Sequence, residues 1–254
     1  MPFSTEANDR PVVPARDRVP AWQTRALGRS LEAARARSVE QMERFLQAAR
    51  SLADETGSAA FTVPQVAARA GLSLKTFYRC FRGKDDLLLA LLEDDSRIGA
   101  GLLSAAVEEH REPVARLRAY VDGIFSMVAL AGAVGYAGVL VREHRRLSED
   151  YPEELRGALA PMVDLLAREI TRAADAGLVR RDDAARDAQT IFGLLLSAIH
   201  DVTMGRADPL ELAPYVWGFC WAGLHGEPRG EGPTELSLRH SETPVTEQRT
   251  RWTR

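Results

Sequence analysis

Apolar residues recur every three or four positions through most of the sequence, which is the period of an α-helix that buries one face. This pattern predicts long helices over residues 37–57, 84–103, 153–176, 182–203 and 209–224. Two shorter helices are expected between residues 62 and 81, on either side of a turn. We therefore predict an all-α fold, with an N-terminal head of three helices and a larger helical domain behind it.

The segment from Thr62 to Lys84 has the signals of two helices joined by a tight turn. Thr62 and Gln65 have the spacing of a capping box, in which each side chain bonds a free N–H group of the first helical turn. Gly71 suits the positive φ of a helix end. We expect a helix-turn-helix over residues 62–81.

The second of these helices is expected to begin after Ser73, which can cap it, and to run from Leu74 to Phe81. Leu74, Phe77 and Phe81 share one face, which predicts a buried stripe. The residues left facing outward are Lys75, Thr76, Tyr78 and Arg79. Cationic and hydroxyl side chains bond base edges and phosphate oxygens, so this face suits the major groove of DNA.

Charge also separates this segment from the rest of the chain. Residues 62–84 contain five Lys and Arg and no Asp or Glu, whereas the whole chain has a net charge of −3. A protein with so little net charge can bind nucleic acid only through a local basic patch. Lys84 also opens the following helix, whose N–H groups and dipole favour a phosphate.

The string G-L-S-x-x-T-F-Y-x-x-F-x-x-K-x-x-L-L at residues 71–88 resembles the DNA-binding signature of the tetracycline-repressor (TetR) family. The resemblance implies a DNA-binding head at residues 37–97. The residues expected to contact DNA are Thr62, Ser73, Lys75, Thr76, Tyr78, Arg79, Arg82 and Lys84. One departure is Cys80, because many family members have a His or Tyr there that touches a phosphate, a contact that a thiol makes poorly.

The resemblance also implies a ligand-binding and dimerisation domain, here residues 98–226. Its late helices resemble those with which TetR dimers form a four-helix interface, and a symmetric dimer can read the two half-sites of a palindromic operator. The residues expected to line a pocket for a small, mostly apolar effector are Phe125, Met127, Tyr136, Phe192, His200 and Trp217. For each of them alone, ordinary core packing is the favoured alternative.

A repressor released by its ligand is the function that the resemblance implies, acting in the cytoplasm on the nucleoid, with no metal and no cofactor. An activator is an alternative. So is a regulator that responds to an acyl-coenzyme A-like ligand, because a basic cluster could grip the phosphates of such a molecule. That cluster consists of Arg142, His144, Arg145 and Arg146.

An all-α enzyme is far less favoured. Its acidic and histidine clusters are Asp94–Asp95, Glu108–Glu109–His110 and Glu143–His144. None has metal-ligand spacing, and the sequence lacks a nucleophile elbow, a phosphate loop and a dinucleotide glycine pattern. The two cysteines, Cys80 and Cys220, are far apart and are expected to be reduced thiols.

Three segments carry weaker signals. Residues 1–36 combine several prolines with more Arg than acid, so we expect a disordered basic arm, and residues 227–254 are expected to form a disordered tail. Residues 123–141 carry no charge, as a membrane span would require. Glycines interrupt that run, and a buried pair of helices bent or joined near Gly132 is favoured over a membrane span. No secretory signal is recognised at the start of the sequence.

Overall fold

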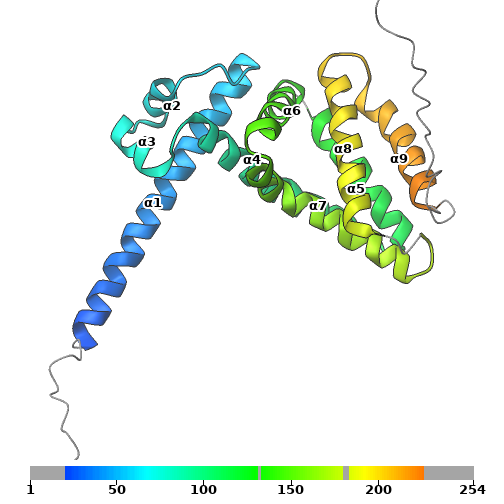
Figure 1. Ribbon diagram of the computed structural model, residues 1–254, viewed down its shortest axis with the longest axis horizontal. Coiled ribbons are helices and arrows are strands. Elements are labelled where there is room, and N and C mark those ends of the chain that lie inside the picture. The colour runs from blue at the N-terminus through cyan, green and yellow to red at the C-terminus, as the bar shows by residue number, and fades with distance from the viewer. Residues whose placement is uncertain (1–20, 131–132, 180–182, 226–254) are drawn as a thin grey trace, which may run out of the picture.

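The computed structural model describes residues 21–130, 133–179 and 183–225, and every regular element within those ranges is an α-helix. In chain order the helices are α1 (Ala21–Thr56), α2 (Val63–Ala70), α3 (Leu74–Cys80), α4 (Lys84–Glu108), α5 (Pro113–Ala129), α6 (Ala133–Asp150), α7 (Pro152–Asp175), α8 (Ala184–Thr203) and α9 (Pro209–His225). We call α1–α3 the head and α5–α9 the body, and α4 joins the two (Figure 1). The predicted all-α fold with an N-terminal helix-turn-helix is confirmed.

The two short helices of the head carry the caps that the sequence predicts. The N–H of Gln65 donates to the Thr62 hydroxyl at 3.4 Å, and Gln65 Oε1 accepts from the N–H of Thr62 at 2.7 Å. Gly71 ends α2 with a φ of +62°, in the left-handed region. Ser73 Oγ accepts from the N–H of Thr76 at 3.1 Å and so begins α3. These local bonds set the angle between α2 and α3.

Three aromatic rings form the centre of the head. Phe77 of α3 is fully buried and meets Phe45 of α1 edge-on, with ring centroids 5.3 Å apart, while the Phe77 and Phe81 centroids are 5.5 Å apart. The sequence predicts Leu74 in this buried stripe, but Leu74 is 44% exposed. The prediction was wrong because α3 has only seven residues, and Phe77 alone fills the side that meets α1.

α1 is longer than the sequence predicts. Residues 21–36 belong to the predicted disordered arm, yet they are helical and extend α1 away from the rest of the head as a rod (Figure 1). Trp22, Leu27 and Leu31 are all more than half exposed, so burial does not hold this part of the helix. The prediction was wrong because it required a buried face, whereas Ala, Leu, Arg and Glu favour helix intrinsically. Residues 1–20 and the predicted tail lie outside the described residues.

α4 runs without a break from the head into the body, so the predicted boundary between residues 97 and 98 falls inside a helix. Leu87 and Leu91 near its start belong to a hydrophobic cluster with the head, which also takes in Val139 of α6 and Leu155 of α7. Leu103, farther along α4, belongs to the separate cluster of the body. Each cluster therefore packs against a different part of one helix.

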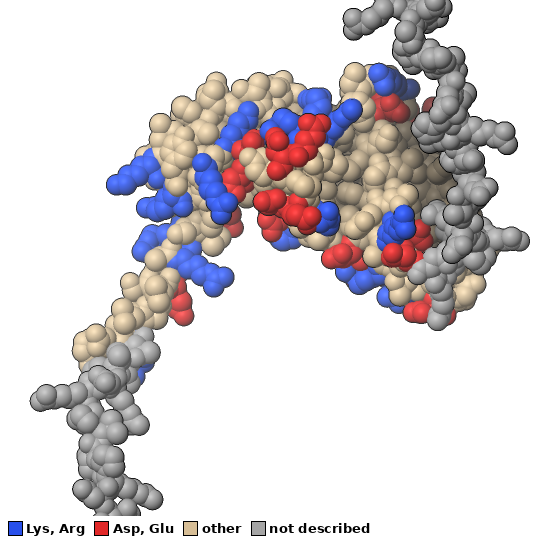
Figure 2. Space-filling model, in the orientation of Figure 1, with Lys and Arg blue, Asp and Glu red and all other residues tan. Residues whose placement is uncertain are grey.

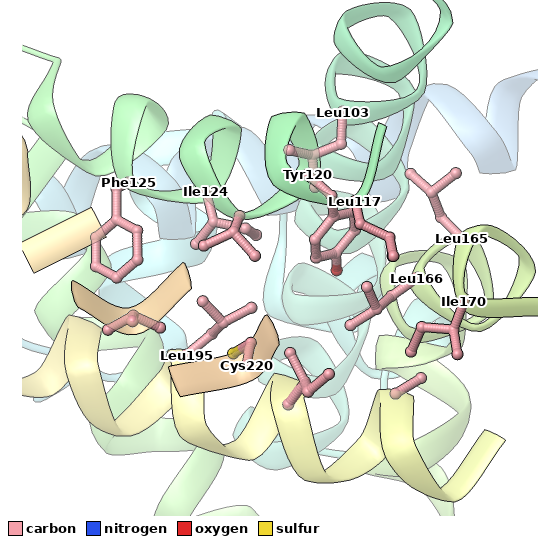
Figure 3. Close-up of a cluster of buried hydrophobic side chains, with 14 of the residues drawn as sticks. Leu103, Leu117, Tyr120, Ile124, Phe125, Leu165, Leu166, Ile170, Leu195 and Cys220 are labelled. Carbon is pink, nitrogen blue, oxygen red and sulfur yellow. The ribbon is translucent and has the colours of Figure 1, made fainter. Parts of the chain in front are cut away.

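Side chains from four helices of the body converge in its core (Figure 3). They include Leu117, Ile124 and Phe125 of α5, Leu165, Leu166 and Ile170 of α7, Leu195 of α8 and Cys220 of α9. Gly123 allows α5 to approach α4 closely, because a Cβ at this position would lie only 2.7 Å from Leu103 Cδ2. The Tyr120 hydroxyl, otherwise enclosed by this core, donates to the carbonyl of Met162 at 3.1 Å.

One ion pair crosses the body between α5 and α7. Arg116 Nε lies 2.6 Å from Glu169 Oε2, and Arg116 Nη2 lies 2.9 Å from Glu169 Oε1. Burial of Glu169 would raise its pKa, but the bonds and charge of Arg116 outweigh that effect, and the pKa lies below its ordinary value. Glu169 is therefore a buried carboxylate whose charge is compensated.

The uncharged segment forms the predicted pair of helices. α5 ends at Ala129 and α6 begins at Ala133, on either side of Gly132, which itself lies outside the described residues. Among the helices that the structure describes, none is by itself long and apolar enough to cross a membrane. α5 and α6 reach that length and apolarity only together, and they are bent by 114°.

Candidate functional site

α3 turns a polar face to solvent on the outside of the head. Phe77 points into the core, whereas Lys75, Tyr78 and Arg79 are exposed, with 61% of Tyr78 accessible. Thr76 is half-buried, and its hydroxyl lies 2.9 Å from that of Ser73. The exposed face thus offers two cations and a phenol, groups that bond phosphates and base edges.

Side chains of α1 fix the helix-turn-helix from behind. Arg44 Nη2 donates to the carbonyl of Ala70 at 2.6 Å, which satisfies the C-terminal end of α2. Gln41 Oε1 accepts from Arg79 Nη2 at 2.7 Å, so Arg79 is already oriented along one side of α3. Arg44 and Gln41 were missed at the sequence level, because contacts made across such separations leave no local spacing signal.

The start of α4 adds a second set of polar groups beside α3. Lys84 Nζ lies 5.1 Å from the centre of the Phe61 ring, a cation–π contact that holds the lysine at the N-terminus of α4. Arg82 is exposed, and its N–H donates to Asp86 Oδ2 at 2.8 Å. The predicted site residue Thr62 is exposed too, but its hydroxyl is engaged in the cap of α2.

Lys and Arg side chains gather over the outer end of the head, around α2 and α3, whereas acidic side chains are frequent nearer the junction with the body (Figure 2). The sequence contains only two lysines, Lys75 and Lys84, and both belong to this surface. Cys80 is half-buried there, and burial raises the pKa of its thiol, although the charge of Arg79 opposes the effect. The thiol therefore stays uncharged at neutral pH.

The body contains a cavity of about 260 Å³ between α4, α5, α6, α7 and α8. Its wall is apolar except where α4 and α6 meet. The polar residues of the wall are Asp95, Ser96, Tyr136 and His144. Burial lowers the pKa of His144, so this side chain is neutral at pH 7.

A second, larger cavity of about 580 Å³ shares Val141, His144 and Leu196 with the first. Its wall is basic, and it includes Arg142, Arg145, Arg146 and His200. The two cavities are therefore neighbours: one is mostly apolar and lies between α4 and the body, and the other is cationic and lies beside α6.

α6 also bonds the head directly. Arg142 Nη2 donates to the carbonyl of Gly57, just after α1, at 2.5 Å, and Arg146 Nη2 lies 2.6 Å from Asp85 Oδ1 in the first turn of α4. Residues that line the cavities are thus in contact with the elements that carry α3.

Residues 45–91 match the family model described as bacterial regulatory proteins, tetR family. This segment is a tetR-family DNA-binding domain. The match takes in the end of α1, the whole of α2 and α3 and the start of α4, including the buried Phe45, Phe77 and Phe81. None of the curated proteins matches the chain.

Solved structures share its fold at low sequence identity. FadR from Bacillus subtilis, solved in complex with stearoyl-CoA, is 22% identical, with a TM-score of 0.61 over 72% of this chain and 99% of FadR. RolR in complex with resorcinol is 18% identical, with a TM-score of 0.57 over 74% of this chain and 89% of RolR. Reduced NemR from E. coli is 19% identical, with a TM-score of 0.55 over 74% of this chain and all 100% of NemR. At these identities the similarity establishes a common fold.

The six predicted pocket residues lie in three places. Met127, Tyr136 and Phe192 line the apolar cavity, and His200 lines the basic one. Phe125 is instead fully buried in the body core, and Trp217 stacks on Trp221 within α9, with ring centroids 5.8 Å apart. Neither of these two residues lines the apolar or the basic cavity.

Two of the three acidic clusters considered for an enzyme contain residues with structural partners. Asp94 and Asp95 bond Arg50, and Glu143 pairs with Arg146 at 2.8 Å. Within the described residues no three His, Cys, Asp or Glu side chains lie close enough together to hold a metal ion.

Proposed function

We propose that the chain is a dimeric, ligand-responsive transcriptional repressor that a small, mostly apolar effector releases from a palindromic DNA operator. The observation that carries this proposal is the exposed face of α3, where Lys75, Tyr78 and Arg79 stand in solvent above the buried Phe77. A short capped helix with such a face can enter a major groove. A regulator of this kind acts in the cytoplasm, on the nucleoid.

Dimerisation through α8 and α9 is favoured by their outward faces. On α9, Tyr215 and Phe219 are one turn apart and are 73% and 64% exposed. On α8, Thr190 and Leu194 line a groove together with Phe219, so α8 and α9 share this surface. Large apolar side chains exposed on adjacent helices are typical of helix–helix interfaces.

The effector site is the apolar cavity. Its position between α4 and the body helices places a ligand beside the helix that leads to the head. A ligand that binds one arrangement of α4 more tightly than the other shifts the population of DNA-competent dimers. The relatives FadR and RolR were solved with stearoyl-CoA and with resorcinol, so this fold accommodates ligands of very different size.

DNA selected from a random pool by the purified protein tests the proposal. We expect Tyr78→Ala to weaken binding to all sequences about tenfold, and Lys84→Ala to reduce the salt slope of log K by about 1. Lys75→Ala and Thr76→Ala should change which base pairs are preferred. Arg118→Ala, on the surface of α5, is the matched control and should bind as wild type.

The two lysines allow a second, independent test of the proposed DNA contact. Acetylation of the native protein, followed by mass spectrometry, should modify Lys75 and Lys84 when the protein is free and spare them when DNA is bound. Equal modification in both states, or wild-type binding by all four head variants, would contradict the proposal.

A second candidate is a regulator of an acyl-coenzyme A-like ligand, as repressor or as activator. The basic cavity favours it, because Arg142, Arg145 and Arg146 could hold phosphates while an acyl chain enters the adjoining apolar cavity. Calorimetry with an acyl-coenzyme A and with the matching free fatty acid distinguishes the two. Tighter binding of the coenzyme A ester, lost in Arg145→Ala, supports this candidate.

A further inference from the structure

A polar cluster in the wall of the apolar cavity connects that cavity to the head. The Tyr136 hydroxyl of α6 donates to Asp95 Oδ2 of α4 at 2.5 Å. Asp95 Oδ1 in turn accepts from Arg50 of α1, from Nη2 at 2.6 Å and from Nε at 3.2 Å. One carboxylate therefore ties together a helix of the head, the connecting helix and a helix of the body.

The charges in this cluster are fixed by their surroundings. Burial, together with the charge of Asp95, raises the pKa of Tyr136, so the phenol remains a donor at neutral pH. Burial would lower the pKa of Arg50, but the hydrogen bonds and charge of Asp95 outweigh it, and Arg50 stays a cation. Arg50 also bonds Asp94, which pairs in turn with Arg97, so two carboxylates here face two cations.

Ser96, the next residue on α4, lines the same cavity but lacks the hydrogen bonds that Asp95 and Tyr136 have. It is only 3% exposed, and its hydroxyl finds no hydrogen-bond partner among the described residues. A buried hydroxyl without a partner is unfavourable, and a ligand group that supplies the missing bond gains affinity from it. An orphan hydroxyl facing an otherwise apolar cavity marks the place where a ligand would put its polar group.

The neighbours of Ser96 restrict what that polar group can be. An anionic group would lie beside the Asp95 carboxylate, and His144 is neutral and cannot compensate it. A cationic group would add a third positive charge to two carboxylates, Asp94 and Asp95, that already pair with Arg50 and Arg97. A hydroxyl fits both sides, since it can accept from Ser96 and donate to Asp95 as Tyr136 does.

We infer that the effector is a small apolar molecule with one alcohol or phenol group, which bonds Ser96 and displaces Tyr136 from Asp95. This inference rests on the proposed function and deepens it. The displacement removes the bond between α6 and α4 near the start of α6. Farther along α6, Arg142 bonds Gly57 of the head and Arg146 pairs with Asp85 of α4, so a shift of α6 reaches both. Asp95 keeps its bonds to Arg50 through Oδ1. A cavity of about 260 Å³ suits one or two rings.

Three probes that differ in a single group test the ligand class. They are naphthalene, 1-naphthol and 1-naphthoate, with binding measured by calorimetry on the full chain. We expect 1-naphthol to bind about tenfold more tightly than naphthalene, the effect of one hydrogen bond to a buried group. Ser96→Ala should remove this advantage. Ser104→Ala, also on α4 but bonded to Glu108, should keep it.

Tyr136→Phe tests the displacement. Because the ligand no longer competes with a phenol for Asp95, we expect this variant to bind 1-naphthol about tenfold more tightly than wild type. Without any ligand it should bind the selected DNA about as weakly as the wild type does with saturating 1-naphthol. Damage to the fold would instead lower both affinities. Tyr120→Phe removes a more deeply buried phenol hydroxyl, bonded to the carbonyl of Met162, and should do neither.

The outcomes separate this inference from the proposed function. A protein that selects no DNA overturns the proposed function and the inference with it. A protein that selects DNA but binds 1-naphthol no better than naphthalene overturns the inference alone. Preference for 1-naphthoate also overturns it, in favour of an anionic ligand, as does weaker naphthol binding by Tyr136→Phe.

Discussion

The head and the body hold their polar side chains in opposite ways. In the head, Lys75 and Tyr78 stand in solvent and are positioned from below by helix caps and by Phe77. At the edge of the body, Asp95 of α4 and Tyr136 of α6 line a cavity and are bonded to each other. Exposed groups on a rigid support act nearly independently, whereas bonded groups in a low-dielectric site are coupled. Substitutions on the head surface should therefore add, and substitutions around the cavity should not.

The largest expected effect comes from a substitution that destabilises the folded head and leaves the body folded. Phe77→Ala removes the ring at the centre of the head cluster, which costs about 4 kcal/mol of stability. The body has its own hydrophobic cluster, so hydrogen exchange should rise at amides of residues 45–81 and stay unchanged in α5, α8 and α9. Tyr78→Ala, at the neighbouring exposed position, is the control and should leave exchange as in wild type. A uniform rise through the chain would show that the two clusters unfold as one.

The next effect is confined to the body and depends on pH. Glu169→Gln leaves Arg116 buried without its counter-charge, which should cost about 3 kcal/mol at pH 7. The pKa of Glu169 is lowered in the folded state, so its contribution is present above the ordinary glutamate pKa of about 4.3 and disappears as the pH falls through the lowered value. Urea unfolding at pH 7 and at progressively lower pH should show the free energies of unfolding of the wild type and of Glu169→Gln becoming equal.

The matched control for that pair is Glu153→Gln at the start of α7. Glu153 pairs with Arg156 on the surface, where both side chains are mostly exposed, so its loss should hardly change stability at any pH. A stability difference for Glu169→Gln that stayed constant down to low pH would mean that packing, and not charge, accounts for it.

The smallest expected effect is the loss of a cap in the head. Ser73→Ala removes the acceptor for the N–H of Thr76 and should cost about 1 kcal/mol. Because α3 is short, we expect the loss to appear as fraying of α3 with no change in the body. Chemical-shift changes that extend beyond α2, α3 and their contacts on α1 would contradict this, and Ser104→Ala on α4 serves as the comparison.

The sequence predicts the local structure of the head better than the polar contacts around the cavity. The caps at Thr62 and Ser73 and the αL glycine Gly71 are local, so spacing alone predicts them, and the structure contains all three. The bonds from Arg50 to Asp95 and from Tyr136 to Asp95 join residues more than 40 positions apart. The spacing of residues along the chain does not predict such a pairing. From the sequence alone, Asp94–Asp95 is therefore more easily interpreted as a catalytic cluster than as a pair of residues that holds helices together.

Two differences from the sequence predictions have simple physical sources. Residues 21–36 form a helix although nothing buries them, which a search for an apolar face cannot detect but helix propensity can. Phe125 and Met127 are two positions apart on α5 and so face in nearly opposite directions, and Phe125 fills the core whereas Met127 lines the cavity. The direction of a side chain on a helix that is buried on several sides depends on the packing of every neighbour, and this information is absent from the pattern.

The unbroken course of α4 makes it a lever. Its 25 residues have a length of about 37 Å at 1.5 Å per residue. Pivoting such a rod by about 5° at one end carries the other end about 3 Å, close to the 3.4 Å that separates successive base pairs. A change around the cavity too slight to alter the fold would thus shift α3 by nearly one step along the double helix.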